Sequence, residues 1–199
     1  MLDLGAAIED DMVLSFLQSE IDSARFAQYY QRILINSGLD RNSLIDQPDR
    51  CSPQARQTRR DLLRSVRGYG NNDALFRGFP NDLAWRRIIL EQSDLPKLKY
   101  ANYPSWVQLS RGTRLAIDGA TNLGSDTAGE EAVNICAIVA DLRRGRQYPP
   151  LIGVYDKSGE NILLIEGHSR ATAYAAAQLP EQFECITGSS PTIETWVFY

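Results

Sequence analysis

The residues of this chain whose types could do chemistry gather in one short turn, Gly167-His168-Ser169-Arg170. His168 is the single histidine among 199 residues, and an imidazole can donate to a phosphate or move a proton near neutral pH. Arg170 can grip two phosphate oxygens at once, and Ser169 offers a hydroxyl. Gly167 lets a ligand come close to the backbone. This composition predicts an anion-binding turn.

Two elements must position that turn. The apolar run at residues 162–165 predicts a buried strand, and the alanine-rich segment at residues 171–178 predicts a helix. The turn between them then lies at a helix N-terminus, where free backbone N–H groups and the helix dipole favour anions. A second interpretation stays open, in which the serine caps the helix, the arginine lies in solvent and the histidine is a hydrogen-bonded structural residue.

The composition is ordinary for a soluble globular protein, with 43% hydrophobic and 23% charged residues. No run of about 18 apolar residues exists, so we expect no membrane partner. The net charge of −4 and the pI of about 5.1 argue against broad electrostatic binding to nucleic acid. A local basic face is still compatible with these values.

The cysteines indicate a reducing compartment. Cys51, Cys136 and Cys185 are widely spaced and odd in number, which fits free thiols in the cytoplasm better than a disulfide framework. With one histidine and no CxxC pair, we expect no structural zinc. The N-terminus is acidic and does not have the composition of a signal peptide.

The first half of the chain predicts mostly helices, over residues 7–19, 22–37, 53–67 and 82–92. The third of them places five arginines in one arc of about 140°, namely Arg56, Arg59, Arg60, Arg64 and Arg67. One interpretation is a solvated face paired to nearby carboxylates. The other is a surface for phosphate, nucleic acid or an acidic partner.

A second candidate anion loop is Ser110-Arg111-Gly112-Thr113-Arg114. If the N-terminal helices pack over the open end of the sheet, Arg111 and Arg114 would reach a nucleotide bound at Gly167. They would add positive charge to its phosphates as an arginine finger does, and Tyr103 and Trp106 would stack on its base. The alternative is that Arg114 ties the loop to a surface carboxylate.

Small and turn-forming residues at 124–129 predict the boundary between two regions, a helical N-terminal region at 1–124 and a second region at 125–199. Beyond the boundary we expect a helix at 130–144 and a hairpin of strands 151–155 and 162–165. A closing strand is expected at 192–198. The predicted fold class is α+β, with the helical region packed on a small mixed sheet made from residues 150–198.

The C-terminal part resembles the ParB/sulfiredoxin superfamily over about residues 128–180. The resemblance is carried by Gly145, Pro149-Pro150, the strand–turn–strand pattern and the sequence from Glu166 to Arg170 with its helix. The superfamily includes nucleotide-binding domains of ParB partition proteins, sulfiredoxin, an ADP-dependent free-serine kinase and ParB-like nucleases. The resemblance implies a nucleotide-binding domain in which His168 and Arg170 contact phosphates, with backbone or hydroxyl contacts from Gly167 and Ser169.

The sequence also departs from these relatives. Gly167 stands where sulfiredoxin has its reactive cysteine, so repair of sulfinic acids is not expected. Ser169 stands where the serine kinase has a second histidine. No helix-turn-helix follows the motif before Tyr199, so a partition role is not expected either.

The predicted function is an enzyme that transfers or hydrolyses a phosphoryl group of ATP or ADP, with CTP also considered, together with Mg²⁺. Glu166 or Glu130 would act as the base beside His168, and Glu130 with Glu131 would hold Mg²⁺ through water. The alternative role of Glu130 and Glu131 is to stabilise the dipole of the helix that they begin.

Two further functions stay open. One is a non-catalytic module that senses a nucleotide or binds a small-molecule or protein partner. The other is a DNA-directed ParB-like protein, which the acidic pI disfavours without excluding it.

Overall fold

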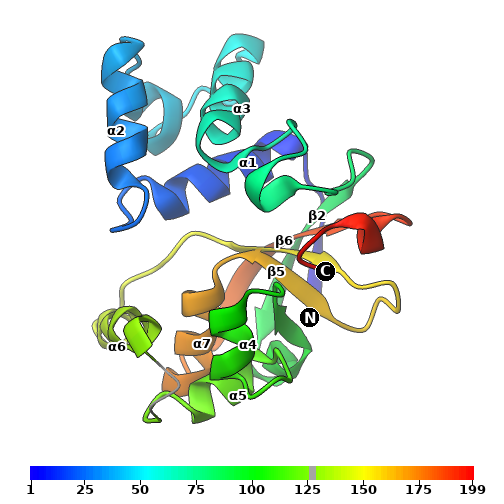
Figure 1. Cartoon of the computed structure of the whole chain (residues 1–199). Helices are drawn as coiled ribbons and strands as arrows, with labels where there is room; N and C mark the ends of the chain where they lie inside the picture. Colours follow the sequence, from blue (N-terminus) through cyan, green and yellow to red (C-terminus); the bar gives the residue numbers. More distant parts are fainter. Residues whose placement is uncertain (126–128) are drawn as a thin grey trace.

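A computed structural model describes residues 1–125 and 129–199 of the chain, and it has a six-stranded mixed sheet with helices on both faces (Figure 1). The strand order is β1-β2-β6-β4-β5-β3. The pairs β1–β2, β2–β6 and β4–β5 are antiparallel, whereas β4–β6 and β3–β5 are parallel. The predicted α+β class is confirmed. The strands are β1 (Leu2–Ala6), β2 (Ala84–Glu91), β3 (Leu98–Tyr100), β4 (Leu151–Tyr155), β5 (Ile162–Glu166) and β6 (Gln182–Ser189).

The helices form two groups, one on each face of the sheet. The first group is α1 (Glu9–Glu20), α2 (Ala27–Asn36) and α3 (Pro53–Arg67), with a π-helical turn η1 (Asn42–Asp46). The second group is α4 (Pro104–Leu109), α5 (Ala116–Thr121), α6 (Gly129–Arg143) and α7 (His168–Ala177). The described residues also contain three short 3-10 turns, η2 (Ala74–Phe76), η3 (Gln92–Lys97) and η4 (Ile193–Thr195).

The sheet is buried on both faces because its central strands are continuously apolar. On β5, Leu163 and Ile165 face the cluster formed with α1 and α3. Ile162 and Leu164 face the cluster formed with α4 to α7. The two-residue period of the strand therefore divides one apolar run between two cores.

The predicted hairpin is confirmed, since β4 and β5 pair antiparallel around the turn that contains Asp156. The carboxylate of Asp156 accepts hydrogen bonds from the backbone N–H groups of Glu160 and Asn161 and from the Ser158 hydroxyl. This carboxylate organises the turn and so fixes the register of the strand that leads to Gly167.

The predicted start and end of α3 are also confirmed. The Ser52 hydroxyl accepts a hydrogen bond from the N–H of Ala55, and Pro53 occupies the first helical position. Gly68 follows the helix with φ +78°, as a C-terminal glycine in the left-handed region does.

The helix predicted over residues 82–92 is wrong, because this segment is the strand β2. It pairs with β6 over eight residue pairs, and its side chains alternate between the two cores, with Trp85 on one side and Ile88 and Leu90 on the other. Over so short a segment, the spacing of its apolar residues fits the 3.6-residue period of a helix as well as the two-residue period of a strand. Pairing with a strand about 100 residues away decides between them.

The sheet expected from residues 150–198 alone is wrong too, because β1, β2 and β3 all precede the predicted boundary. Strands from both sides of residue 124 therefore share one sheet. Residues 126–128, which are part of the predicted boundary, lie outside the described residues. The closing strand is β6, and the segment expected to be a strand at 192–198 contains η4 instead. There the indole of Trp196 is buried and donates to the carbonyl oxygen of Leu75 at 2.7 Å.

Within the described part of the chain, no helix is both long and apolar enough to cross a membrane.

Candidate functional site at the start of α7

The turn from β5 into α7 has the geometry that the sequence predicts. Gly167 has φ +102°, and a Cβ at this position would stand 2.5 Å from Cδ2 of Leu151, so only glycine fits. The first helical hydrogen bond runs from the N–H of Ala171 to the carbonyl oxygen of Gly167 at 2.8 Å. The preceding N–H groups, those of residues 168–170, have no acceptor among the described residues. These donors lie at the positive end of the helix dipole.

His168 lies beneath this turn as a buried, neutral side chain. Its Nε2 atom accepts a hydrogen bond from the N–H of Ala101 at 3.1 Å. Its ring packs against Tyr100, Trp106 and Tyr103, with centroid distances of 5.8, 5.3 and 5.9 Å. Burial, reinforced by nearby arginines, lowers the pKa of His168 to about 3. At neutral pH the imidazole is therefore an uncharged acceptor that anchors the turn to the end of β3.

Four arginine side chains lie near enough to that imidazole for their charges to act on it. Burial is the larger cause of its lowered pKa, and the charges of Arg67, Arg114, Arg25 and Arg170 lower that pKa further. They come from the first helical layer, the loop after α4 and α7 itself. The start of α7 is therefore a place where positive charge from distant parts of the chain accumulates.

The guanidinium group of Arg170 joins the turn to two other parts of the fold. One nitrogen, Nη1, donates to the carbonyl oxygens of Pro149 and Pro150 just before β4. The other, Nη2, donates at 2.9 Å to the Ser19 hydroxyl of α1 and to Oε1 of Glu166. Arg170 thus connects both halves of the chain, and these bonds already occupy its two terminal nitrogens.

The remaining predicted residues of the turn also have protein partners. Oε2 of Glu166 accepts from the N–H of Gly167 at 2.5 Å. The Ser169 hydroxyl accepts from Nδ2 of Asn134 on α6 at 3.1 Å. Glu166 is therefore both ion-paired and hydrogen-bonded, while Ser169 links the start of α7 to α6.

A buried acid that the sequence reasoning missed lies opposite the turn. Glu20 ends α1 and is 6% exposed. It accepts a hydrogen bond from the Tyr30 hydroxyl at 2.9 Å, and Nε of Arg67 lies 3.5 Å from its other oxygen. Burial raises the pKa of Glu20 to about 7, although the charge of Arg67 opposes the shift and that of Glu166 reinforces it. Glu20 can therefore exchange a proton near neutral pH.

We call the meeting of α1, α3 and the turn the junction. Its members carry charge or polar hydrogen-bonding groups at one place in the fold, and they are Ser19, Glu20, Arg67, Glu166, His168 and Arg170. The signal in the sequence was an acid one turn after buried Phe16 and Leu17, on the apolar side of α1. Its closeness to Arg67 and Glu166 comes from tertiary packing and has no local sequence signal.

The loop of Arg111 and Arg114 lies next to this region. Arg114 is half-buried and donates to three carbonyl oxygens, those of Tyr100 at 2.8 Å, Tyr199 at 3.2 Å and Phe198 at 3.4 Å. It therefore ties the loop to β3 and to the C-terminal segment through backbone groups, where the sequence alternative expected a carboxylate. Arg111 is exposed. A role for either arginine in holding a nucleotide stays a prediction.

The predicted base-stacking residues pack within the protein. Trp106 is buried and Tyr103 is half-buried, and both rings lie against His168.

The expected magnesium ligands begin α6. The side chain of Glu130 lies outside the described part of the chain. Glu131 is half-buried, and its charge adds to burial and to Asp118 in raising the pKa of Tyr100. Among the described residues, no group of three or more His, Cys, Asp or Glu side chains could hold a metal ion. The structure therefore offers no preformed protein cage for Mg²⁺ in the part it describes.

The arginine face of α3 is paired to the protein itself. Arg59 is fully buried and makes a two-pronged ion pair with Asp10, at 2.8 and 2.6 Å. The other four contact the carbonyl oxygen of Arg50 or a carboxylate of Glu9, Asp61 or Glu20. These contacts favour the interpretation in which the face is paired to nearby groups.

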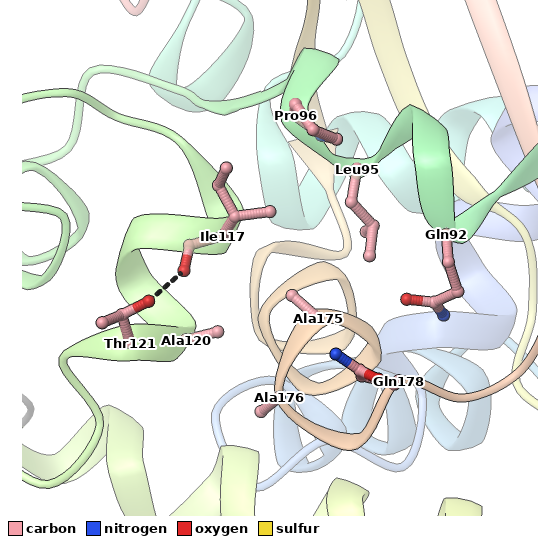
Figure 2. A pocket seen from close by; sticks show the side chains of 9 residues that line it. All are labelled: Gln92, Leu95, Pro96, Ile117, Ala120, Thr121, Ala175, Ala176 and Gln178. Atoms are coloured by element: carbon pink, nitrogen blue, oxygen red, sulfur yellow. Dashed lines mark hydrogen bonds between the residues drawn. The ribbon is translucent and has the colours of Figure 1, made fainter.

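A cavity lies at the opposite end of α7 (Figure 2). It has a volume of about 540 Å³ between η3, α5 and the end of α7. Its lining residues are uncharged, and they are Gln92, Leu95, Pro96, Ile117, Ala120, Thr121, Ala175, Ala176 and Gln178. This cavity therefore has no charged group to hold an anion, and the charged groups of the junction lie away from it.

The fold and the junction define an α+β protein whose mixed sheet carries a polar, arginine-rich contact between its two helical layers. Comparison with family models, with curated proteins and with solved structures finds no match to this chain. The resemblance to the ParB/sulfiredoxin superfamily accordingly stays a prediction from its motif.

Proposed function

We propose that the chain binds a nucleotide by its phosphates at the junction and transfers or hydrolyses a phosphoryl group. One observation carries the proposal: three backbone N–H groups at the start of α7 have no acceptor in the described part of the chain, and the charges of four arginines act on His168 in the same turn. Unpaired N–H groups at a helix N-terminus combined with arginines are the groups that proteins use for phosphates.

Within this proposal Glu20 is the proton acceptor. Its pKa of about 7 matches a general base at neutral pH, and Ser19 next to it contacts Arg170. Glu20 would take the proton of the attacking hydroxyl or water while Arg67 and the N–H groups of the turn stabilise the phosphate charge. A Mg²⁺ bound with the nucleotide would neutralise phosphate charge, and no step assigned to this chain's residues runs through it.

The second candidate function is a non-catalytic nucleotide-sensing or partner-binding module. The observation in its favour is that Arg170 and His168 already make hydrogen bonds within the protein. A phosphate would then be held by the N–H groups and Arg67, and the turn would serve as a rigid support. Tight binding without product would support this function over phosphoryl transfer.

The test is isothermal titration with ATP, ADP and CTP, each with Mg²⁺. We expect a Kd below the millimolar range for at least one of them, and we expect Arg67→Gln to weaken it about tenfold or more because one charge-assisted hydrogen bond is lost. The matched control is Arg144→Gln, which removes a surface arginine paired to Asp141 and should leave the Kd unchanged. Absence of binding to all three nucleotides would contradict the proposal.

A further inference from the structure

A second cavity lies beside the end of α3, and none of the junction residues lines it. It has a volume of about 250 Å³ and is lined by Tyr69, Gly70, Asn72, Phe76, Gly78, Phe79 and Asn81. Ligand pockets for drug-sized molecules are usually larger, roughly 300 to 1,000 Å³. A cavity of this size suits a molecule with one ring.

The apolar side of the cavity is a chain of edge-to-face aromatic rings. Tyr69 and Phe76 have a centroid distance of 4.8 Å, and Phe76 and Phe79 one of 5.2 Å. Edge-to-face contact leaves ring faces and edges to which a further flat ring can add favourably.

Two arginines of α3 lie beside Gly70, which is one of the residues that line the cavity. The Nη2 atoms of Arg60 and Arg64 each lie 3.7 Å from the point where a Cβ on Gly70 would stand. Each guanidinium group uses its Nη1 for an acid, Glu9 at 3.1 Å for Arg60 and Asp61 at 2.7 Å for Arg64. Two positive groups are therefore held together while part of each remains available.

The available part of each guanidinium group is its Nη2 donor. The Nε atoms of Arg60 and Arg64 are buried and have no hydrogen-bond partner in the described residues, and their Nη2 atoms have none there either. Buried donors without a partner are uncommon in folded proteins. Asn81 adds an exposed amide to the lining, and within residues 1–125 and 129–199 that amide has no hydrogen-bond partner.

We propose that this cavity is a binding site for a small aromatic anion, with the ring against Tyr69, Phe76 and Phe79 and the anionic group between Arg60 and Arg64. Paired guanidinium groups suit phosphate or carboxylate oxygens. The site is independent of the nucleotide site at the junction, since it shares none of the junction residues.

The test is an NMR titration of the ¹⁵N-labelled chain with phenyl phosphate, inorganic phosphate and phenol. Phenyl phosphate should saturate, shift the amide signals of Gly70, Asn72 and Asn81, and bind about tenfold or more tightly than either of the other two probes. Shifts at Ser169 in place of these three, or a failure of phenyl phosphate to saturate, would overturn the proposal. Shifts at Ser169 would overturn this proposal and support the phosphate site at the start of α7, whereas a failure to saturate would leave nucleotide binding measured by calorimetry unaffected.

Two variants sharpen the test. Arg64→Gln should weaken phenyl phosphate about tenfold or more, while Arg144→Gln, at a surface arginine that does not line the cavity, should leave it unchanged. Asn81→Asp places a negative charge at the exposed end of the cavity, so it should weaken phenyl phosphate and leave phenol unaffected. Unchanged affinity for phenyl phosphate in both Arg64→Gln and Asn81→Asp would overturn the proposal.

Discussion

The two ends of α7 differ in burial, charge and hydrogen bonding. The first turn is buried, charged and hydrogen-bonded to α1, α6, β3 and the segment before β4. The last turn, at Ala175 and Ala176, borders the cavity of about 540 Å³, which is lined by uncharged side chains. The comparison shows that the end of α7 that borders a cavity is not the end that carries charged groups. The groups that could hold a phosphate or move a proton lie at the junction, and none of them lines this cavity.

The largest expected effect comes from removing the connection at the first turn. Arg170→Ala leaves Glu166 and the carbonyl oxygens of Pro149 and Pro150 without their donor, and loss of one partner from a buried ion pair costs about 3 to 5 kcal/mol. The free energy of unfolding from urea denaturation measures it. Ala176→Ser at the other end is the control, expected to change stability by less than about 0.5 kcal/mol. Equal effects of the two substitutions would remove the contrast between the ends.

The next effect is acid destabilisation through His168. Its pKa is about 3 in the folded protein against 6.5 as the ordinary value, so the unfolded chain binds a proton between these values and the folded chain does not. The contribution of His168 to the free energy of unfolding is therefore fully present above pH 6.5. It is lost as the pH falls, by about 3 kcal/mol at pH 4. His168→Gln should remove this component, so the stability difference from the wild type should shrink on acidification. A constant difference from pH 7 to pH 4 would contradict it.

Glu20 should give a somewhat smaller effect of opposite sign. Its pKa is raised from 4.5 to about 7, so the folded chain holds a proton that the unfolded chain releases. Its contribution to stability is full below pH 4.5 and is lost as the pH rises towards 7, by about 2 kcal/mol at pH 6. Glu20→Gln, which keeps the shape and stays neutral, should gain stability relative to the wild type over this range. A parallel pH profile of the two proteins would show that Glu20 is ionised throughout.

The sequence predicted the first turn of α7 well because its signals are local. An apolar run, a glycine and an alanine-rich segment specify a strand, a tight turn and a helix within 17 residues, 162–178. The glycine is required by φ +102° and by the contact with Leu151. Local patterning likewise placed α3 and the β4–β5 hairpin.

The parts that were missed depend on distant segments. β2 is a strand because β6 pairs with it, and Arg114 reaches the carbonyl oxygens of residues about 85 positions later. Glu20, Arg67 and Glu166 meet only when α1, α3 and β5 are packed. Residue types therefore indicated an anion site, but the sequence had no means of showing that Arg170 would also hold the fold together.

The central claim is that phosphate binds at the first turn of α7, and amide NMR tests it most directly. On titration with ADP and Mg²⁺, the N–H signals of His168, Ser169 and Arg170 should shift and saturate together, since these donors have no acceptor among the described residues. The signals of Ala175 and Ala176 at the cavity should stay in place. Saturating shifts confined to the cavity end, with the first turn unchanged, would contradict the account.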